Sequence, residues 1–215
     1  MRKTLEGGRY GIRWTITEQL DDLDYADDIS LLSEAWKAVQ EKLNRMNRYS
    51  LQAGLKINTK KTESLRINAK NQQPFKIAGE DVKDVETFKY LGATVSTNGG
   101  TEVEMKLRIG KARSAYYRLN KVWRSKIYRR KTKLRIFQSN VLSILMYGCE
   151  TWKMTEKDEQ RLDVFFHKCL RKILQIYWPV VITNKEVREL AHMEKLSTQI
   201  QQRRWKYIGH ILRKE

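Results

Sequence analysis

Apolar positions follow two different periods along this chain, and the period changes near residue 100. Before about residue 98, short alternations of apolar and polar residues favour β-strands, with one helix among them. After that point, apolar residues recur every three or four positions, which is typical of amphipathic helices. The pattern therefore predicts an α+β protein, with small β-hairpins and an antiparallel sheet followed by an all-helical part.

The most informative strand pair surrounds the run Tyr25-Ala26-Asp27-Asp28. Leu20 and Leu23 lead into this run, and Ile29 to Leu32 lead away from it. Two apolar arms around an acidic tetrapeptide predict a β-hairpin with carboxylates at its tip. Because neighbouring strand residues point to opposite faces, we expect one of the two aspartates to face inward and the other outward.

Other short apolar runs in the first part also predict strands. One helix is expected from Ala35 to about Ser50, because its apolar residues have helical spacing and Gly54 lies where a helix would end. The predicted strands are 12–16, 56–58, 64–68, 74–78 and a strand pair over 88–96.

Helices are predicted throughout the second part. An apolar seam from Met105 to Trp123 has spacings of four and three, and a second seam runs from Leu134 to Leu145. Capping pairs of the form Ser/Thr-x-x-Asp/Glu predict helix starts at Thr101, Thr155 and Thr183. The helix after Thr155 is expected to end near Trp178, and a last helix is expected from Leu196 to Ile211.

The net positive charge of the chain comes entirely from its second part. The formal net charge is +18, yet residues 1–104 hold 16 basic and 16 acidic side chains and balance to zero. No acid occurs from Met105 to Cys149, whereas 13 lysines and arginines lie between Lys106 and Arg135. Solvated helix faces usually mix the two signs, so this segment indicates a polyanionic partner, nucleic acid before a membrane surface. A merely soluble basic face is the weaker interpretation.

Several classes of protein do not fit the sequence. No apolar run approaches the roughly 18 residues of a membrane span, and the first residues lack the apolar core of a secretory signal. Two cysteines, Cys149 and Cys169, make neither a disulfide framework nor a zinc-knuckle spacing. We therefore expect an intracellular protein that is not secreted, has no membrane association and keeps its thiols reduced.

The acidic hairpin has two readings on composition alone. Five aspartates fall within positions 21–28, and such crowding repels itself unless cations are present. Aspartate is also common in polar turns, and on composition alone we favour that simpler reading.

The run Leu23-Asp24-Tyr25-Ala26-Asp27-Asp28-Ile29 resembles the catalytic hairpin of reverse transcriptases of non-LTR retrotransposons, the endonuclease-reverse transcriptase type. Residues 54–63 resemble the next palm motif, with its lysine at Lys61, and Phe88-Lys89-Tyr90-Leu91-Gly92 resembles the primer grip. Residues 148–152 and 203–210 are similar to segments downstream of the thumb. The resemblance covers essentially all 215 residues in the family's order, and it makes a catalytic reading of the hairpin the stronger one.

This resemblance implies an RNA-directed DNA polymerase, a nucleotidyltransferase that uses two Mg²⁺ (or Mn²⁺) ions for in-line phosphoryl transfer. Asp27 is implied as the principal metal ligand with Asp28 assisting, and Lys61 lies near the incoming deoxynucleoside triphosphate or remains a surface lysine. Lys89, Tyr90 and Gly92 are the implied primer contacts. The implied domains are a partial palm (1–100), a helical thumb (101–150) and a helical post-thumb extension (151–215).

The partners implied are an RNA template and a DNA primer duplex. The cations that lie mainly off the first helical seam are expected to contact phosphates, namely Lys106, Arg108, Lys111, Arg113, Arg118, Lys121 and Arg124. Tyr116, Tyr117, Trp123 and Tyr128 either stack on bases or, more often for seam residues, fill the core. Residues 124–135 also fit a nuclear localisation signal, which the sequence does not separate from phosphate binding. Core or surface roles are favoured over a zinc site for His167, Cys169, His192 and His210.

The sequence departs from the family's pattern before Tyr25. Nothing there resembles the earlier palm strand that carries another metal-binding aspartate, or the fingers, so we expect a C-terminal palm, thumb and post-thumb fragment that is inactive alone. The alternative is a non-catalytic, basic nucleic-acid-binding module whose acidic hairpin is vestigial.

Overall fold

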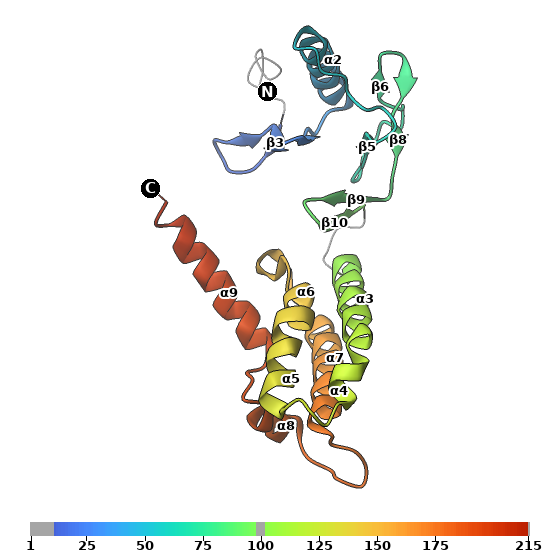
Figure 1. The fold of residues 1–215 in the computed structure, drawn as a ribbon. Helices are drawn as coiled ribbons and strands as arrows, with labels where there is room; N and C mark the ends of the chain where they lie inside the picture. Colours follow the sequence, from blue (N-terminus) through green and yellow to red (C-terminus); the bar gives the residue numbers. More distant parts are fainter. Residues whose placement is uncertain (1–10, 98–101, 215) are drawn as a thin grey trace. The chain divides into compact units, whose positions relative to one another are not determined.

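The computed structural model describes residues 11–97 and 102–214, which form an α+β fold as predicted (Figure 1). The chain divides into two compact units, residues 1–99 and residues 100–215, here called unit 1 and unit 2. The division falls where the apolar period changes from that of strands to that of helices. No helix in the described ranges is long and apolar enough to cross a membrane.

Unit 1 consists of short two-stranded ladders around one helix, α2 (Trp36–Gln52). The antiparallel pairs are β1 (Ile12–Arg13) with β2 (Gln19–Leu20), β3 (Asp22–Tyr25) with β4 (Asp28–Leu31), β6 (Lys76–Ile77) with β7 (Glu80–Asp81), and β9 (Thr87–Tyr90) with β10 (Ala93–Ser96). The parallel pair is β5 (Glu63–Ser64) with β8 (Lys83–Asp84). The expected antiparallel sheet is thus divided into separate pairs, one of them parallel.

The core of unit 1 is small. Leu43 of α2 packs with Phe75, Ile77 and Val82, and Leu31 of β4 joins this cluster from its edge. A core of this size covers few strand faces, and this explains why several predicted strands are shorter than expected.

Four strand predictions are wrong, three of them in extent and one altogether. The strand predicted over 12–16 pairs only at Ile12–Arg13, and beyond it the Trp14 and Ile16 side chains are 72% and 98% exposed. The run 56–58 is not a strand; the Asn58 carbonyl instead accepts turn hydrogen bonds from the N–H groups of Lys61 and Thr62. Within the predicted 64–68 and 74–78, pairing is limited to the short β5 and β6.

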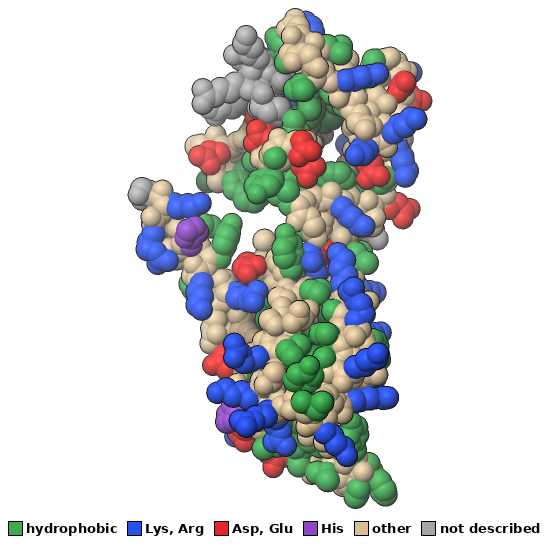
Figure 2. Space-filling model, in the orientation of Figure 1, with side chains coloured by type: hydrophobic (Ala, Val, Ile, Leu, Met, Phe, Trp, Pro, Cys, Tyr) green, Lys and Arg blue, Asp and Glu red, His purple; other side chains and the backbone are tan. Residues whose placement is uncertain are grey.

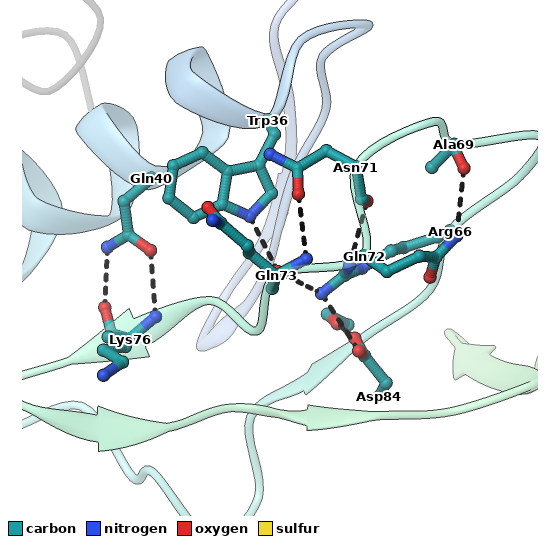
Figure 3. Close-up of polar contacts among 10 residues, drawn as sticks. Trp36, Gln40, Arg66, Ala69, Asn71, Gln72, Gln73, Lys76 and Asp84 are labelled. Atoms are coloured by element: carbon teal, nitrogen blue, oxygen red, sulfur yellow. Dashed lines mark hydrogen bonds and ion pairs between the residues drawn. The ribbon is translucent and has the colours of Figure 1, made fainter.

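A polar network joins α2 to the chain that follows β5 (Figure 3). The Gln40 side chain donates to the carbonyl of Lys76 at 2.8 Å and accepts from its N–H at 2.9 Å, so one amide replaces a strand partner. Trp36 Nε1 and Arg66 Nη2 both donate to the carbonyl of Gln73, at 2.8 and 2.7 Å. These side chains satisfy backbone groups that no neighbouring strand reaches.

Unit 2 is entirely helical in its described part. Its elements are α3 (Glu102–Arg118), α4 (Asn120–Arg124), α5 (Arg130–Phe137), a π-helical turn η1 (Gln138–Leu142), α6 (Ser143–Leu145), a 3₁₀ turn η2 (Cys149–Thr151), α7 (Glu156–Leu174), α8 (Asn184–Ala191) and α9 (Leu196–Ile211).

One hydrophobic core extends through unit 2, from Met105 on α3 to Ile200 on α9. Both predicted seams face it, and the rings of Tyr116 and Trp123 stack at 5.1 Å between centroids. The expected thumb (101–150) and extension (151–215) therefore share this core, with α7 in the middle of the bundle.

The predicted helix starts at Thr155 and Thr183 are confirmed. Each threonine hydroxyl accepts from the backbone N–H three residues later, and that residue's carboxylate accepts from the threonine backbone N–H. Thr101 lies outside the described residues. The end of α7 was predicted too late: the helix stops at Leu174, because Gln175 adopts a left-handed conformation with φ of 58°.

Candidate functional site

The acidic hairpin is tight, as predicted. Tyr25 pairs directly with Asp28, which leaves Ala26 and Asp27 as a two-residue turn. Ala26 has a φ of 56°, the left-handed conformation that such turns often require of one residue. Asp27 therefore lies in the turn itself and Asp28 begins β4, and both side chains are exposed.

Two other aspartates of the hairpin, Asp22 and Asp24, lie on one face. Residues that pair directly across a ladder share a face, so Asp22 and Asp24 lie on the same side as Leu31, which packs on the core of unit 1. Partial burial, followed by the nearby charges of Asp24 and Asp21, raises the pKa of Asp22. The expectation that Asp27 and Asp28 occupy opposite strand faces is wrong, because Asp27 is in the turn and strand alternation does not apply there.

A buried lysine fixes the base of the hairpin to α2. Lys42 Nζ contacts the Asp21 carboxylate at 2.6 Å and also donates to the carbonyls of Asp21 and Leu32, at 3.2 and 2.8 Å. One ammonium thus holds both arms of the hairpin, at the residues just beyond the Asp22–Leu31 pair that ends the ladder opposite its turn. The sequence does not predict this contact, since its only signal is one lysine on the apolar side of the predicted helix.

The predicted primer-grip segment forms a second hairpin. Leu91 and Gly92 make its turn, with φ values of 48° and 80°. Partial burial raises the pKa of Tyr90, and the carboxylates of Asp28 and Asp24 raise it further. This dependence places Tyr90 within electrostatic range of the acidic hairpin. Lys89 is adjacent in the strand and exposed, and its side chain lies on the other face.

The structure does not join Lys61 to the acidic hairpin. Lys61 is exposed in the turn that follows Asn58, whose backbone carbonyl and side chain accept from the Lys61 N–H at 3.1 and 3.2 Å. Within residues 11–97 no hydrogen bond or ion pair of its ammonium is observed. Its two readings, a triphosphate contact and a surface lysine, are equally compatible with this position.

A complete metal site is not formed by the described residues. Nowhere in residues 11–97 and 102–214 do three or more His, Cys, Asp or Glu side chains gather closely enough to hold a metal ion. Asp27 and Asp28 nevertheless provide the carboxylate oxygens that Mg²⁺ prefers. Two carboxylates are fewer than such a site needs, so the described residues do not complete it by themselves.

Most cations predicted to contact phosphates are accessible on α3 and α4. Figure 2 shows lysine and arginine side chains over the helices of unit 2. The exposed members of the predicted set are Lys106, Lys111, Arg113, Arg118, Lys121 and Arg124. Lys106 pairs with Glu102 at 3.0 Å, one turn earlier on the helix.

The prediction that Arg108 contacts phosphates is wrong. It is only 6% exposed, its Nε lies 2.5 Å from the Glu104 carboxylate, and its guanidinium covers the Tyr147 ring at 4.5 Å. Arg108 therefore stabilises the interior of unit 2 rather than facing a phosphate. Glu104, which pairs with Arg108, lies immediately before the segment that contains no acidic residue.

The aromatic candidates divide by burial. Tyr116 and Trp123 are in the core, as favoured for seam residues, whereas Tyr117 and Tyr128 are about half exposed. Only these last two present ring surface to a ligand.

His167 and Cys169 have core positions on α7. His167 Nδ1 lies 2.7 Å from the Asp163 carbonyl, and its Nε2 lies 3.0 Å from Arg188 Nη1 on α8. Burial raises the pKa of the Cys169 thiol to about 12 and that of Cys149 to about 11, so both remain protonated.

Two late segments that resemble retroelement sequences pack against each other. Arg203 of α9 donates to the carbonyl of Met146 at 3.3 Å, and Arg204 donates to the carbonyl of Trp152. Residues 148–152 and 203–210 are thus one structural feature, although about fifty residues separate them.

Comparison with known proteins gives two matches. Residues 115–147 match the family model "Domain of unknown function (DUF6451)". The matched segment runs from the end of α3 to the chain just after α6. The chain is also 25% identical over 211 residues to a putative uncharacterized transposon-derived protein of Caenorhabditis elegans, with 91% of this chain and 73% of that protein covered. This similarity indicates a transposon origin.

Proposed function

We propose that this chain is the palm, thumb and post-thumb portion of an RNA-directed DNA polymerase from a non-LTR retrotransposon. The observation that supports this most is the tight hairpin with Asp27 in its turn and Asp28 at the start of β4. The transposon-derived relative agrees with such an origin.

Each part of the candidate site has a role in this proposal. Asp27 and Asp28 hold divalent cations, which neutralise charge on the transferred phosphoryl group when they are bound. Tyr90 and Gly92 lie at or beside the turn of the second hairpin and position the primer end, together with Lys89. The exposed cations of α3 and α4 bind the phosphates of the primer-template duplex without reading its sequence.

Metal binding by the hairpin is the first test. We expect Mn²⁺ to broaden the amide NMR signals of residues 26–29 selectively, because bound Mn²⁺ relaxes nearby nuclei. Asp27→Asn should weaken this broadening, whereas Glu80→Gln, which removes an exposed acid from another short hairpin, should leave it unchanged. Equal broadening in both variants would contradict a specific role for Asp27.

Polymerase activity is the second test. The chain alone should extend a DNA primer on an RNA template no better than its Asp27→Asn variant, because misplacing reacting groups costs about 10²-fold or more in rate. A longer chain that adds the fingers and the earlier palm aspartate should be active, and Asp27→Asn should abolish that activity. If Asp27→Asn changes nothing in the longer chain, the protein is instead a non-catalytic nucleic-acid-binding module.

A further inference from the structure

A basic groove lies between α3 and α7 in unit 2. Its α3 cations, Lys106 and Arg113, belong to the set proposed above to bind phosphates, whereas its α7 cations have no role in that proposal. The two helices run side by side in the same direction: Glu102 pairs with Arg161 at 2.9 Å near their starts, and the Tyr116 hydroxyl donates to the Cys169 carbonyl at 3.4 Å near their ends. The groove has a volume of about 750 Å³.

Every ionised side chain that lines this groove is positive. The six cations are Lys106, Arg113, Lys157, Arg161, Lys168 and Lys172, and the lining contains no aspartate or glutamate. Glu102 and Asp158 neutralise Lys106 and Arg161 at one end. In the described chain the other four have no carboxylate within 4 Å. Three of these four, Arg113, Lys168 and Lys172, lie along the middle and the far end of the groove, whereas Lys157 lies at the start of α7.

The floor of the groove contains a glycine that the fold itself does not require. Gly110 is in the interior of α3, where glycine costs about 1 kcal/mol relative to alanine. A Cβ built on it meets no atom within 4 Å, and no left-handed backbone angle demands glycine there. The missing side chain leaves open the floor of a groove whose walls are cationic.

An aromatic side chain borders the far end of the groove. Tyr117 is 55% exposed, and Lys172 Nζ lies 5.9 Å from the centroids of both the Tyr116 and Tyr117 rings. A cation beside an exposed ring is the combination with which proteins hold a phosphate and stack the adjoining base.

From these features we infer that the α3–α7 groove binds a single strand of nucleic acid. Packed helices have axes about 8–10 Å apart, so the channel between them admits one strand and not a duplex. The cations of α7 span 15 residues, about 22 Å at 1.5 Å per residue, which is long enough for several nucleotides. The site extends the predicted thumb surface onto α7, which the sequence analysis did not assign to nucleic acid.

The test measures binding of a fluorescein-labelled dT12 oligonucleotide by anisotropy. We expect Arg113→Glu/Lys168→Glu to weaken binding by at least about tenfold, because both charges face the groove. The control Lys206→Glu/Arg213→Glu makes the same charge change on exposed positions of α9 and just after it, and should weaken binding much less. Equal losses in the two variants would overturn the inference, since binding would then follow net charge alone.

A steric variant tests the groove without changing charge. Gly110→Leu should fold, since a Cβ at this position meets no atom within 4 Å, and should weaken dT12 binding by about tenfold. Ser114→Leu adds the same side chain at an exposed position of α3 outside the groove lining and should bind normally. Unchanged binding in Gly110→Leu would refute the site.

Competition identifies the ligand class. An unlabelled single strand should displace dT12 better than a duplex of equal length or a poly-glutamate peptide, and either of the latter competing best would contradict a single-strand site. Asp27→Asn should bind dT12 normally, so failure of the polymerase proposal and failure of this inference remain distinguishable.

Discussion

Individual buried charges position both the hairpin and the helices. Lys42 connects α2 to the base of the acidic hairpin, and Arg108 is held inside unit 2 by Glu104. A buried ion pair adds little to stability compared with a well-packed apolar pair, but removing one partner is costly because the other charge remains. These residues therefore chiefly fix the positions of the elements that they join. We expect their removal to destabilise the structure around those contacts.

Removing the Lys42 ammonium should loosen the acidic hairpin. Lys42→Met leaves the Asp21 carboxylate in place without the cation that neutralises it, and we expect unit 1 to lose about 2–3 kcal/mol. Urea unfolding followed by the amide NMR signals of residues 20–32 measures this loss. Glu41→Gln, which breaks an exposed pair with Arg45 one position away, should cost less than about 0.5 kcal/mol. Similar losses in the two variants would show that Lys42 has no special role.

Protonation of His167 should destabilise unit 2. Burial lowers the pKa of His167 below its usual 6.5, with Arg188 and Arg171 nearby and only the Asp163 carbonyl and carboxylate opposing this shift. Below about pH 6.5 the unfolded chain takes up a proton that the folded chain does not, so stability should fall as the pH falls.

Urea midpoints of unit 2 at pH 7.5 and 5.5 measure this effect. His167→Gln should reduce the difference between the two midpoints, whereas His210→Gln, at an exposed position, should preserve it. A pH dependence that survives His167→Gln in full would assign the effect to other groups.

At the scale of elements, capping residues in the sequence predict most clearly where a helix starts. Thr155→Ala removes the hydroxyl that accepts from the Asp158 N–H and contacts its carboxylate at 2.6 Å, so α7 loses its capping box. We expect unit 2 to lose about 1 kcal/mol. Thr132→Ala, at an exposed position inside α5, should change stability by only a few tenths of a kcal/mol. Denaturant unfolding of the two variants checks this, and equal values would mean that the cap contributes nothing.

The two units of the molecule have cores of very different size. Four buried apolar residues form the core of unit 1, whereas the core of unit 2 extends over α3 to α9. Two-stranded ladders also leave unpaired edges, which provide little protection against local opening. Limited proteolysis should therefore cleave within residues 11–97 before the segment from 102 onward. Equal protection of both units, read by mass spectrometry over time, would show that unit 1 is stabilised by more than its core.

The sequence alone determined the features that depend on neighbours within a few residues. The acidic hairpin, the second hairpin, the helical seams and two capping boxes were predicted correctly, because strand alternation, turn residues and helical spacing are local properties. Strand lengths were overestimated, since a strand persists only where another segment pairs with it or covers it.

Tertiary structure decided which charged groups are available for function. The sequence does not show that Arg108 is buried or that Lys42 reaches the hairpin, because each of these contacts depends on how separate elements pack. The groove between α3 and α7 has the same origin: its cations come from segments some fifty residues apart, and only the packing of two helices brings them to one surface.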